Sequence, residues 1–240
     1  KKIAHELAEN QIASFRFDKR IFKMDELKIK EKDLRFQHFV EDVEQILDHF
    51  NAEGNFSKII VAGHSEGSLI GMMAAKNRAD AFISLAGAGR SIDSIIVDQI
   101  GKQAPGLQDN ARQAMAELRE KGTTENYHPM LASLFRPSVQ PYMHSWIQLN
   151  PAEELKKLEI PVLIIQGTAD VQVETSEAEI LHRAKPEANL ILMQQMNHIF
   201  RKIEGNDDLV NTKSYNEPNR PLHPDLIPAL VNFIQSIEVE

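Results

Sequence analysis

Short apolar runs alternate with amphipathic segments along most of this chain. Brief runs of apolar and β-branched residues are typical of buried strands, whereas apolar residues three and four positions apart are typical of helices. Strands are predicted at residues 12–17, 58–62, 81–85, 160–167 and 189–193. Helices are predicted at residues 1–10, 36–50, 66–77, 175–184 and 224–238, and a charged surface loop at residues 19–33. This alternation predicts an α/β fold with a mostly parallel, twisted sheet flanked by helices.

Residues 90–150 interrupt the alternation and contain no strand pattern. They read as helical pieces at residues 91–103, 108–121, 127–135 and 138–149, separated by prolines and glycines. We therefore divide the chain into an α/β core, residues 1–87 and 151–240, and a helical insertion, residues 88–150. We expect the insertion to lie over the carboxyl edge of the sheet.

Composition limits the possible partners. The chain has 240 residues, enough for one α/β domain, and its net charge of −8 disfavours binding to nucleic acid or to an anionic membrane surface. It contains no cysteine, which excludes disulfides, a thiolate metal site and a cysteine nucleophile. No apolar run approaches the roughly 18 residues of a membrane span. We expect a soluble protein and favour a cytoplasmic location; the sequence does not predict an oligomeric state.

The first ten residues already have helical spacing, and no N-cap residue precedes them. We therefore expect the chain to start within the fold, with further residues before Lys1.

The segment Gly63-His64-Ser65-Glu66-Gly67 joins a predicted strand to a predicted helix. The pattern Gly-x-Ser-x-Gly in this context is a nucleophile elbow, a sharp turn that holds a serine hydroxyl at a helix N-terminus. We expect both glycines to stand where backbones approach each other closely. The helix dipole and the free amides of the first turn favour negative charge beside that hydroxyl.

Two further strand ends carry groups that could activate this serine. Asp170 follows the strand at 160–167, and His198 follows the strand at 189–193. Functional groups collect beyond the carboxyl ends of parallel strands. A serine needs a base within hydrogen-bond reach, a histidine titrates near neutral pH, and a buried carboxylate fixes the tautomer of the ring. The chain order predicts a triad of Ser65, Asp170 and His198.

Other histidines and aspartates compete for these roles, but none follows a strand end in the same way. The histidines are His64, His128, His144 and His223, of which His64 should pack against its neighbours. The aspartates are Asp80, Asp93 and Asp98. We therefore retain Asp170 and His198 as the candidates.

The elbow also predicts an oxyanion donor. The backbone N–H of Glu66, directly after the nucleophile, should bind the oxyanion, and a second donor should come from a loop that would lie before Lys1. The Glu66 side chain is interpreted as a first-turn acid that favours the helix start. A polar group lining the site is the alternative.

Together these residues resemble the α/β-hydrolase superfamily over nearly the whole chain, and within it the bacterial serine esterase and serine-aminopeptidase-like group. The matching segments are residues 13–20, 63–68, 163–170, 197–198 and 221–234. The resemblance implies an α/β-hydrolase fold, a helical cap formed by the insertion, and no cofactor. In the family the first strands and a His-Gly-type oxyanion loop come earlier in the chain, so we expect both before Lys1.

We expect a serine carboxylesterase that cleaves small or medium acyl esters through an acyl-enzyme, with a small-molecule ester as its partner. The insertion should shape the acyl pocket. Its candidate lining residues are Phe135, Tyr142, Met143 and Trp146.

Three alternatives stay open. An aminopeptidase would hold the substrate amine with acidic groups, for which the candidates are Glu117, Glu120 and Glu125. A thioesterase would hold a phosphorylated carrier with basic groups, for which the candidates are Lys19, Arg20, Arg90 and Arg136. The third alternative is a scaffold with this fold and no catalytic activity.

Overall fold

The described residues, 1–205 and 208–238 of a computed structural model, contain a four-stranded parallel sheet. Its order is β1 (Ile60–His64), β2 (Ala81–Leu85), β3 (Val162–Gly167) and β4 (Asn189–Met193). The central strands β2 and β3 are buried along their whole length. Strands covered on both faces need near-continuous apolar runs, and these two segments are apolar except for Ser84 in β2 and Gln166 and Gly167 in β3. The predicted parallel sheet is confirmed.

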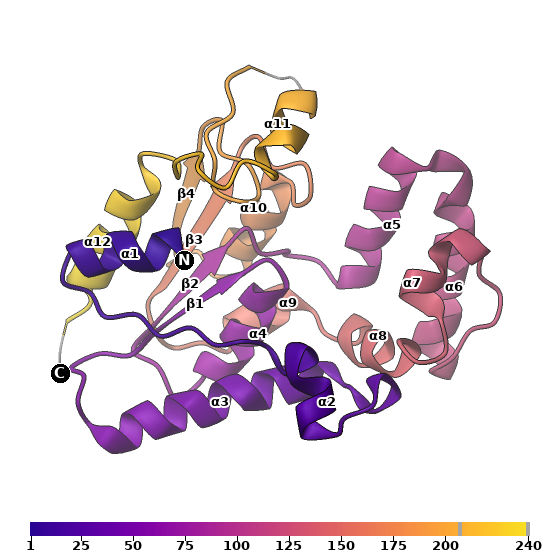
Figure 1. Ribbon diagram of the computed structural model, residues 1–240, viewed down its shortest axis with the longest axis horizontal. Helices are drawn as coiled ribbons and strands as arrows, with labels where there is room; N and C mark the ends of the chain where they lie inside the picture. The colour runs from indigo at the N-terminus through magenta and orange to yellow at the C-terminus, as the bar shows by residue number, and fades with distance from the viewer. Residues whose placement is uncertain (206–207, 239–240) are drawn as a thin grey trace.

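Helices cover both faces of the sheet (Figure 1). One face packs against α3 (Phe36–Glu53), α4 (Glu66–Ala75), α9 (Pro151–Lys156) and α10 (Thr175–Ala184). The other packs against α1 (Lys2–Glu9) and α12 (Leu226–Ser236). Successive strand residues serve opposite layers, since Phe82 belongs to the first core and Ile83 to the second. A further helix, α11 (Asp208–Ser214), precedes α12.

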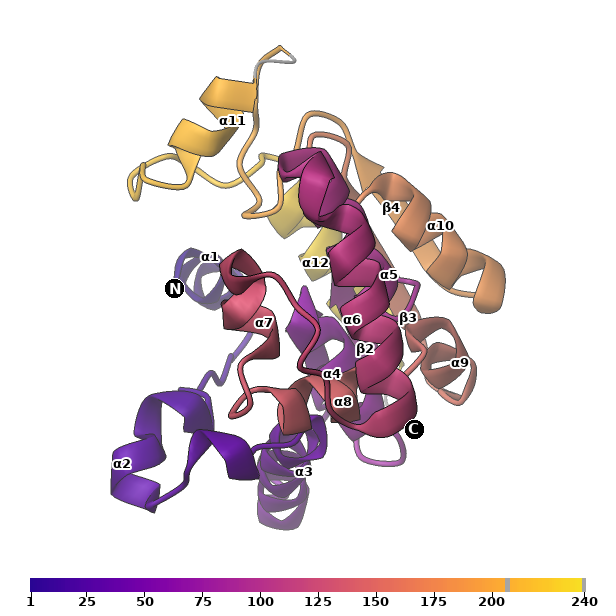
Figure 2. The ribbon, with the colours of Figure 1, turned by 90° about the vertical axis from the view of Figure 1, so that its right-hand side faces the viewer.

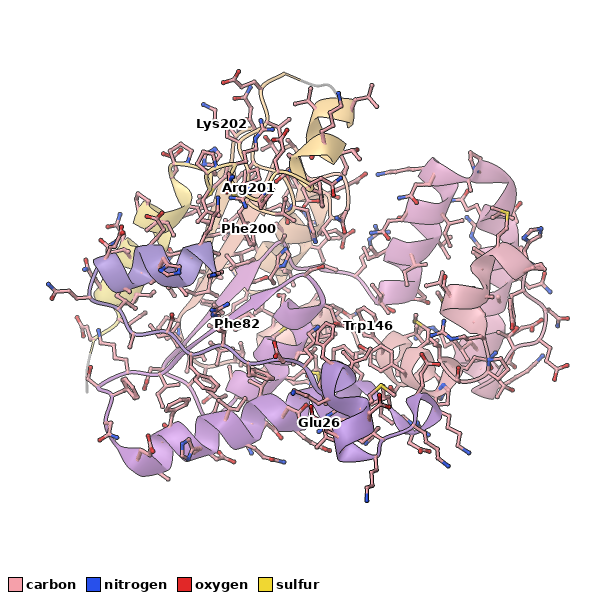
Figure 3. All side chains as sticks on the ribbon, viewed as in Figure 1. Glu26, Phe82, Trp146, Phe200, Arg201 and Lys202 are labelled. Atoms are coloured by element: carbon pink, nitrogen blue, oxygen red, sulfur yellow. The ribbon has the colours of Figure 1, made fainter. Side chains whose placement is uncertain are left out.

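Residues 92–147, between β2 and α9, contain a separate group of helices. They are α5 (Ile92–Gln103), α6 (Gln108–Lys121), α7 (Ala132–Phe135) and α8 (Gln140–Ile147). Figure 1 shows them to one side of the sheet, and Figure 2 shows α5 and α6 in front of it. They enclose their own apolar core around Met115, Leu118 and Phe135. Trp146 packs against both this core and the first sheet layer and lies between them in Figure 3.

The register of the strands aligns their carboxyl ends. His64 pairs with Leu85, which in turn pairs with Ile165, and Gly167 pairs with Met193. The residues that follow the strands therefore leave the sheet along one edge. This is the edge at which Ser65, Asp170 and His198 were predicted to meet.

The predicted strand at residues 12–17 is wrong. These residues are irregular, and Phe15 and Phe17 are 61% and 43% exposed. A strand needs a neighbour to take up its backbone hydrogen bonds, and β1 pairs only with β2 among the residues described. Phe15 instead packs edge-on against Phe50 of α3, with ring centroids 5.1 Å apart.

The charged segment at residues 19–33 has more order than predicted. It contains α2 (Met24–Leu27) between two single-turn 3₁₀ helices, residues 20–23 and 31–33. Arg20 anchors it by a two-pronged bond to Asp42 of α3, at 2.5 and 2.7 Å. Glu31 accepts a bond from Arg136, beyond α7. The charged residues of this segment, which in the sequence are typical of a solvated loop, therefore form ion pairs that attach it to α3 and to the helical group.

No helix within residues 1–205 and 208–238 combines the length and the apolar character that a membrane crossing requires.

Candidate active site

Ser65 occupies a strained turn between β1 and α4. Its φ of 55° and ψ of −121° are rare for a residue with a side chain, and such backbone costs about 1–3 kcal/mol. The surroundings hold it there: the Ser65 N–H donates to the Leu85 carbonyl at 2.9 Å, and the Ser65 carbonyl accepts from the Ser68 N–H at 2.9 Å. The turn has the geometry of a nucleophile elbow, at the residue that the sequence motif predicted.

The two glycines of the motif have different roles. A Cβ on Gly63 would lie 2.1 Å from the carbonyl oxygen of Gly67, so Gly63 lets β1 and the first turn of α4 touch. A Cβ on Gly67 would meet nothing within 4 Å. The expected close approach is therefore confirmed at Gly63 and wrong at Gly67, where the space above the helix is open.

Asp170 and His198 form a buried hydrogen bond. The Asp170 Oδ2 lies 2.8 Å from the His198 Nδ1, and both side chains are almost inaccessible to solvent. Because a carboxylate oxygen accepts, Nδ1 carries the proton, which leaves Nε2 with a lone pair in the neutral ring. The structure thus brings together the two predicted partners from separate strand ends.

The loops after β3 and β4 hold these two residues in register. The Thr168 N–H donates to the Met193 carbonyl at 3.0 Å, and the Ala169 N–H donates to the Met196 carbonyl at 3.0 Å. Gly167 permits this contact, since a Cβ there would lie 2.0 Å from the Met196 oxygen. The Asp170 and His198 loops therefore form one hydrogen-bonded unit.

Asn197 anchors the histidine loop and was not identified from the sequence. Its buried side-chain Nδ2 donates to Asn211 Oδ1 at 3.0 Å and to Ser214 Oγ at 2.8 Å. Its Oδ1 accepts from the Arg201 N–H at 2.9 Å. Two signals were available: the match of residues 197–198 to the family, and an asparagine directly before the candidate histidine, in a loop where asparagine commonly bonds nearby backbone.

The residue before Ser65, His64, contacts His198 and so links the nucleophile turn to the Asp170–His198 pair. The His64 Nε2 lies 2.9 Å from the His198 carbonyl oxygen, and the two imidazole centroids are 4.7 Å apart. No hydrogen bond joins the Ser65 hydroxyl to the His198 ring in the described part of the chain. Such bonds are often long in enzymes without substrate and shorten when the substrate binds.

His64 is expected to make stability depend on pH. Burial, followed by the neighbouring His198, lowers the pKa of His64 to about 4, against about 6.5 in an unfolded chain. Between these two pH values the unfolded state binds a proton at His64 and the folded state does not. The contribution of neutral His64 to the free energy of unfolding is therefore fully present above pH 6.5 and is lost as the pH falls toward 4. The loss approaches about 3 kcal/mol. We expect His64→Gln to remove this part of the pH dependence in denaturant unfolding at pH 7 and pH 4.5, whereas an unchanged difference would contradict the assignment.

The Glu66 side chain joins three parts of the molecule. Its carboxylate accepts from the Tyr142 hydroxyl on α8 and from the Lys19 ammonium on the amino-terminal segment. Burial, with the Glu66 charge, raises the pKa of Tyr142, so this hydroxyl remains a donor. The carboxylate thus has specific partners beyond the helix dipole. The Glu66 backbone N–H belongs to the first turn of α4, where amides have no partner within the helix.

A small cavity opens at Ser65. Its volume is about 80 Å³, and its lining includes Ser65, Glu66, Leu69, Ile95, Trp146 and Val173. A larger cavity of about 260 Å³ shares part of this lining and extends to charged residues. Among the four candidate lining residues from the insertion, Trp146 lines the cavity and Tyr142 binds Glu66. Phe135 and Met143 instead lie in the core of the helical group.

The competing residues have other partners. His144 bonds the Leu118 carbonyl, His223 bonds the Gln194 carbonyl, and His128 accepts from the Met130 N–H. Asp80 accepts from the Ile59 N–H, Asp93 from Arg119, and Asp98 from Arg90. None of these contacts, as the described residues show them, includes Asp170 or His198.

Comparison with known proteins identifies the family of this chain. A family model described as serine aminopeptidase, S33, matches residues 1–201. The curated esterase EstD of Thermotoga maritima is 26% identical over 213 residues, which cover 85% of this chain and 50% of that protein. The chain thus spans about half the length of this relative.

Solved structures agree on the fold. Est1E of Butyrivibrio proteoclasticus superposes with a TM-score of 0.52 at 16% identity, over 85% of this chain and 71% of that chain. Its complex with ferulic acid superposes with a TM-score of 0.50 at 15% identity, over 79% and 70% of the two chains. With the family model matching most of its length, this chain belongs to the serine aminopeptidase S33 family and has the α/β-hydrolase fold.

Proposed function

We propose that this chain is a serine hydrolase of the carboxylesterase type, which cleaves small or medium acyl esters. The observation that carries the proposal is the buried 2.8 Å bond between Asp170 and His198, at the sheet edge that also holds the strained Ser65. The family match supports a hydrolase, and the similarity to EstD supports ester substrates. The cavity of about 80 Å³ at Ser65 favours a short acyl group.

The reaction then proceeds in two halves. The Ser65 oxygen attacks the ester carbonyl carbon while His198 Nε2 takes the hydroxyl proton, and Asp170 stabilises the imidazolium. The Glu66 N–H donates to the oxyanion of the tetrahedral intermediate. The intermediate collapses to the acyl-enzyme as the alcohol leaves with the proton from His198. A water molecule, deprotonated by His198, releases the acid by the reverse sequence.

Residues 88–150 are proposed as a cap over this site. The helical group carries its own apolar core, yet it contributes Ile95 and Trp146 to the cavity at Ser65. Its Tyr142 is bonded to Glu66, directly after the nucleophile. A separate helical layer that supplies one wall of the cavity would select substrates by size while the sheet supplies the reacting groups.

The charges around the site favour an ester over the other two substrates. All four candidate cations for a phosphorylated carrier are already paired with carboxylates: Lys19 with Glu66, Arg20 with Asp42, Arg90 with Glu177, and Arg136 with Glu31. Of the candidate acids for an aminopeptidase, Glu117 bonds Thr124 and Asn126, which follow α6 in the chain. Neither Glu120 nor Glu125 lines the two cavities described above.

A substrate comparison tests the proposal. We expect p-nitrophenyl acetate and butyrate to be hydrolysed faster than the octanoate, and all three faster than aminoacyl anilides or acyl-CoA. In the matched variant His198→Ala, ester turnover should fall by about 10⁴–10⁶-fold, because the base is lost. If an aminoacyl anilide were cleaved faster than the esters, the chain would be assigned as an aminopeptidase, and if acyl-CoA were cleaved faster, as a thioesterase. Full ester turnover in His198→Ala would contradict the mechanism, and no turnover of any substrate by the folded wild type would favour a non-catalytic scaffold.

A further inference from the structure

Gln166 places a side-chain amide against the carboxylate of Asp170. It is the second-last residue of β3, and its side chain is completely buried. Its Nε2 lies 3.0 Å from Asp170 Oδ2, 2.8 Å from the Val173 carbonyl oxygen and 3.3 Å from the Gly167 carbonyl oxygen. All three neighbours are acceptors.

These neighbours settle which way the amide points. An amide nitrogen has two hydrogens to donate, whereas an amide oxygen can only accept. If the side chain were turned over, its oxygen would face three other oxygens in a buried site, one of them charged. The orientation also leaves the Gln166 Oε1 with no hydrogen-bond partner among the described residues. A buried acceptor without a partner costs about 1–3 kcal/mol, so the contacts of Nε2 outweigh this loss.

Gln166 completes the set of donors around Asp170. The Oδ1 atom accepts from the backbone N–H groups of Gln172 and Val173, at 2.8 and 3.0 Å. The Oδ2 atom accepts from His198 and from Gln166. The amide of Gln166 therefore shares with the imidazole the oxygen that would stabilise positive charge on His198.

We infer that Gln166 is a positioning residue for the Asp170–His198 pair: it holds the plane of the Asp170 carboxylate and moderates the negative charge that its Oδ2 presents to the imidazole. This inference rests on the proposed function, because it assigns a role within the same triad. Gln166 acts through Asp170 and does not touch the reacting atoms.

Two measurable effects follow. Without the amide, Asp170 keeps three donors, and its carboxylate can rotate away from the geometry that His198 needs. In addition, Oδ2 then presents more negative charge to the ring, which favours the imidazolium. Because catalysis needs the neutral ring, the acidic limb of the activity profile should move to higher pH.

The test uses Gln166→Leu, with Gln140→Leu as the matched control. Gln140 is also a buried glutamine with two carbonyl acceptors, of Thr124 and Phe135, but it lies on α8 and touches no triad residue. For Gln166→Leu we expect kcat to fall about tenfold, KM to stay within about twofold, and the acidic limb of kcat to move up by roughly half a pH unit. For Gln140→Leu we expect a lower melting temperature with the limb unchanged.

A second pair of variants separates a positioning role from a general loss of stability. In an Asp170→Asn background, Gln166→Leu should cost no further activity, because the group through which it acts is already changed. Where leucine prevents folding, Gln166→Met keeps the length of the side chain and removes the donors. The inference would be overturned if a folded Gln166 variant kept the acidic limb of its kcat profile at the wild-type pH. It would also be overturned if Gln166→Leu lowered activity a further tenfold in the Asp170→Asn background.

The proposed function is tested separately in the same assays. If Ser65→Ala is inactive and Gln166→Leu behaves as wild type, only the role of Gln166 fails. If Ser65→Ala retains the activity of the wild type, the triad itself fails.

Discussion

Replacing Ser65 by alanine is expected to lower kcat for ester hydrolysis by roughly 10⁶-fold and to leave the protein folded. The hydroxyl is the proposed nucleophile, and its loss stops acyl-enzyme formation. Alanine keeps the Cβ and therefore accepts the same strained backbone, with φ near 55°. The melting temperature should stay within about 3 °C of the wild type, since Ser65 belongs to none of the three apolar cores and its substitution creates no cavity in them. Steady-state kinetics and thermal unfolding check both parts.

Ser68→Ala is the matched control for this variant. Ser68 lies on the first turn of the same helix, but its Oγ is buried and lies 2.7 Å from the Oγ of Ser84. Its substitution removes a hydroxyl from the elbow without removing the proposed nucleophile. We expect activity within about threefold of the wild type and a loss of about 1 kcal/mol in stability. Equal losses of activity in the two variants would show that the elbow is sensitive to any change, and would remove the special role of Ser65.

Replacing Gly63 by alanine is expected to destabilise the protein by about 3 kcal/mol and to reduce activity in the fraction that folds. The new Cβ would lie 2.1 Å from the Gly67 carbonyl oxygen and 2.7 Å from the Ser68 Cα. Both atoms belong to the backbone, so no side-chain rotation can relieve the overlap. The start of α4 must move away from β1, and Ser65 moves with it. Urea unfolding gives the change in stability.

The other glycine of the motif provides the contrast. Gly67→Ala adds a Cβ that meets nothing within 4 Å, at the second position of α4. Alanine favours a helix over glycine by up to about 1 kcal/mol, so stability should be unchanged or slightly higher. A loss of stability in Gly67→Ala that equals the loss in Gly63→Ala would contradict the close-contact explanation.

The parallel sheet could be predicted from the sequence because apolar runs identify its strands directly. The runs at 81–85 and 189–193 coincide with β2 and β4, and the helix predicted at 175–184 coincides with α10. The apolar pattern within each of these segments is enough to predict its secondary structure without knowledge of its tertiary contacts. Alternation of strands and helices then implies parallel pairing.

Two segments differ from the secondary structure that the sequence predicted. Residues 12–17 have strand composition, but a strand exists only with a neighbour, and local sequence does not report neighbours. The helix α9 was missed although Asn150 and Pro151 mark its start; the Asn150 side chain accepts from the Ala152 and Glu153 N–H groups.

In the candidate site, too, local sequence predicted some features, and others depend on tertiary contacts. Motif and chain order were enough to predict that Asp170 and His198 would meet, because the strand ends share one sheet edge. The supporting contacts of Gln166, Asn197 and Glu66 could not be predicted, since each joins segments whose mutual placement the sequence does not specify. Glu66 illustrates the limit: its first-turn position was evident, whereas its partners Lys19 and Tyr142 come from distant segments.

The most direct test of the central claim is labelling of the purified chain with a fluorophosphonate, followed by mass spectrometry of the digested protein. The account predicts a single adduct on Ser65, formed at a rate that falls by several orders of magnitude in His198→Ala. A folded wild-type sample without an adduct on Ser65, or one labelled equally fast in the His198 variant, would contradict it.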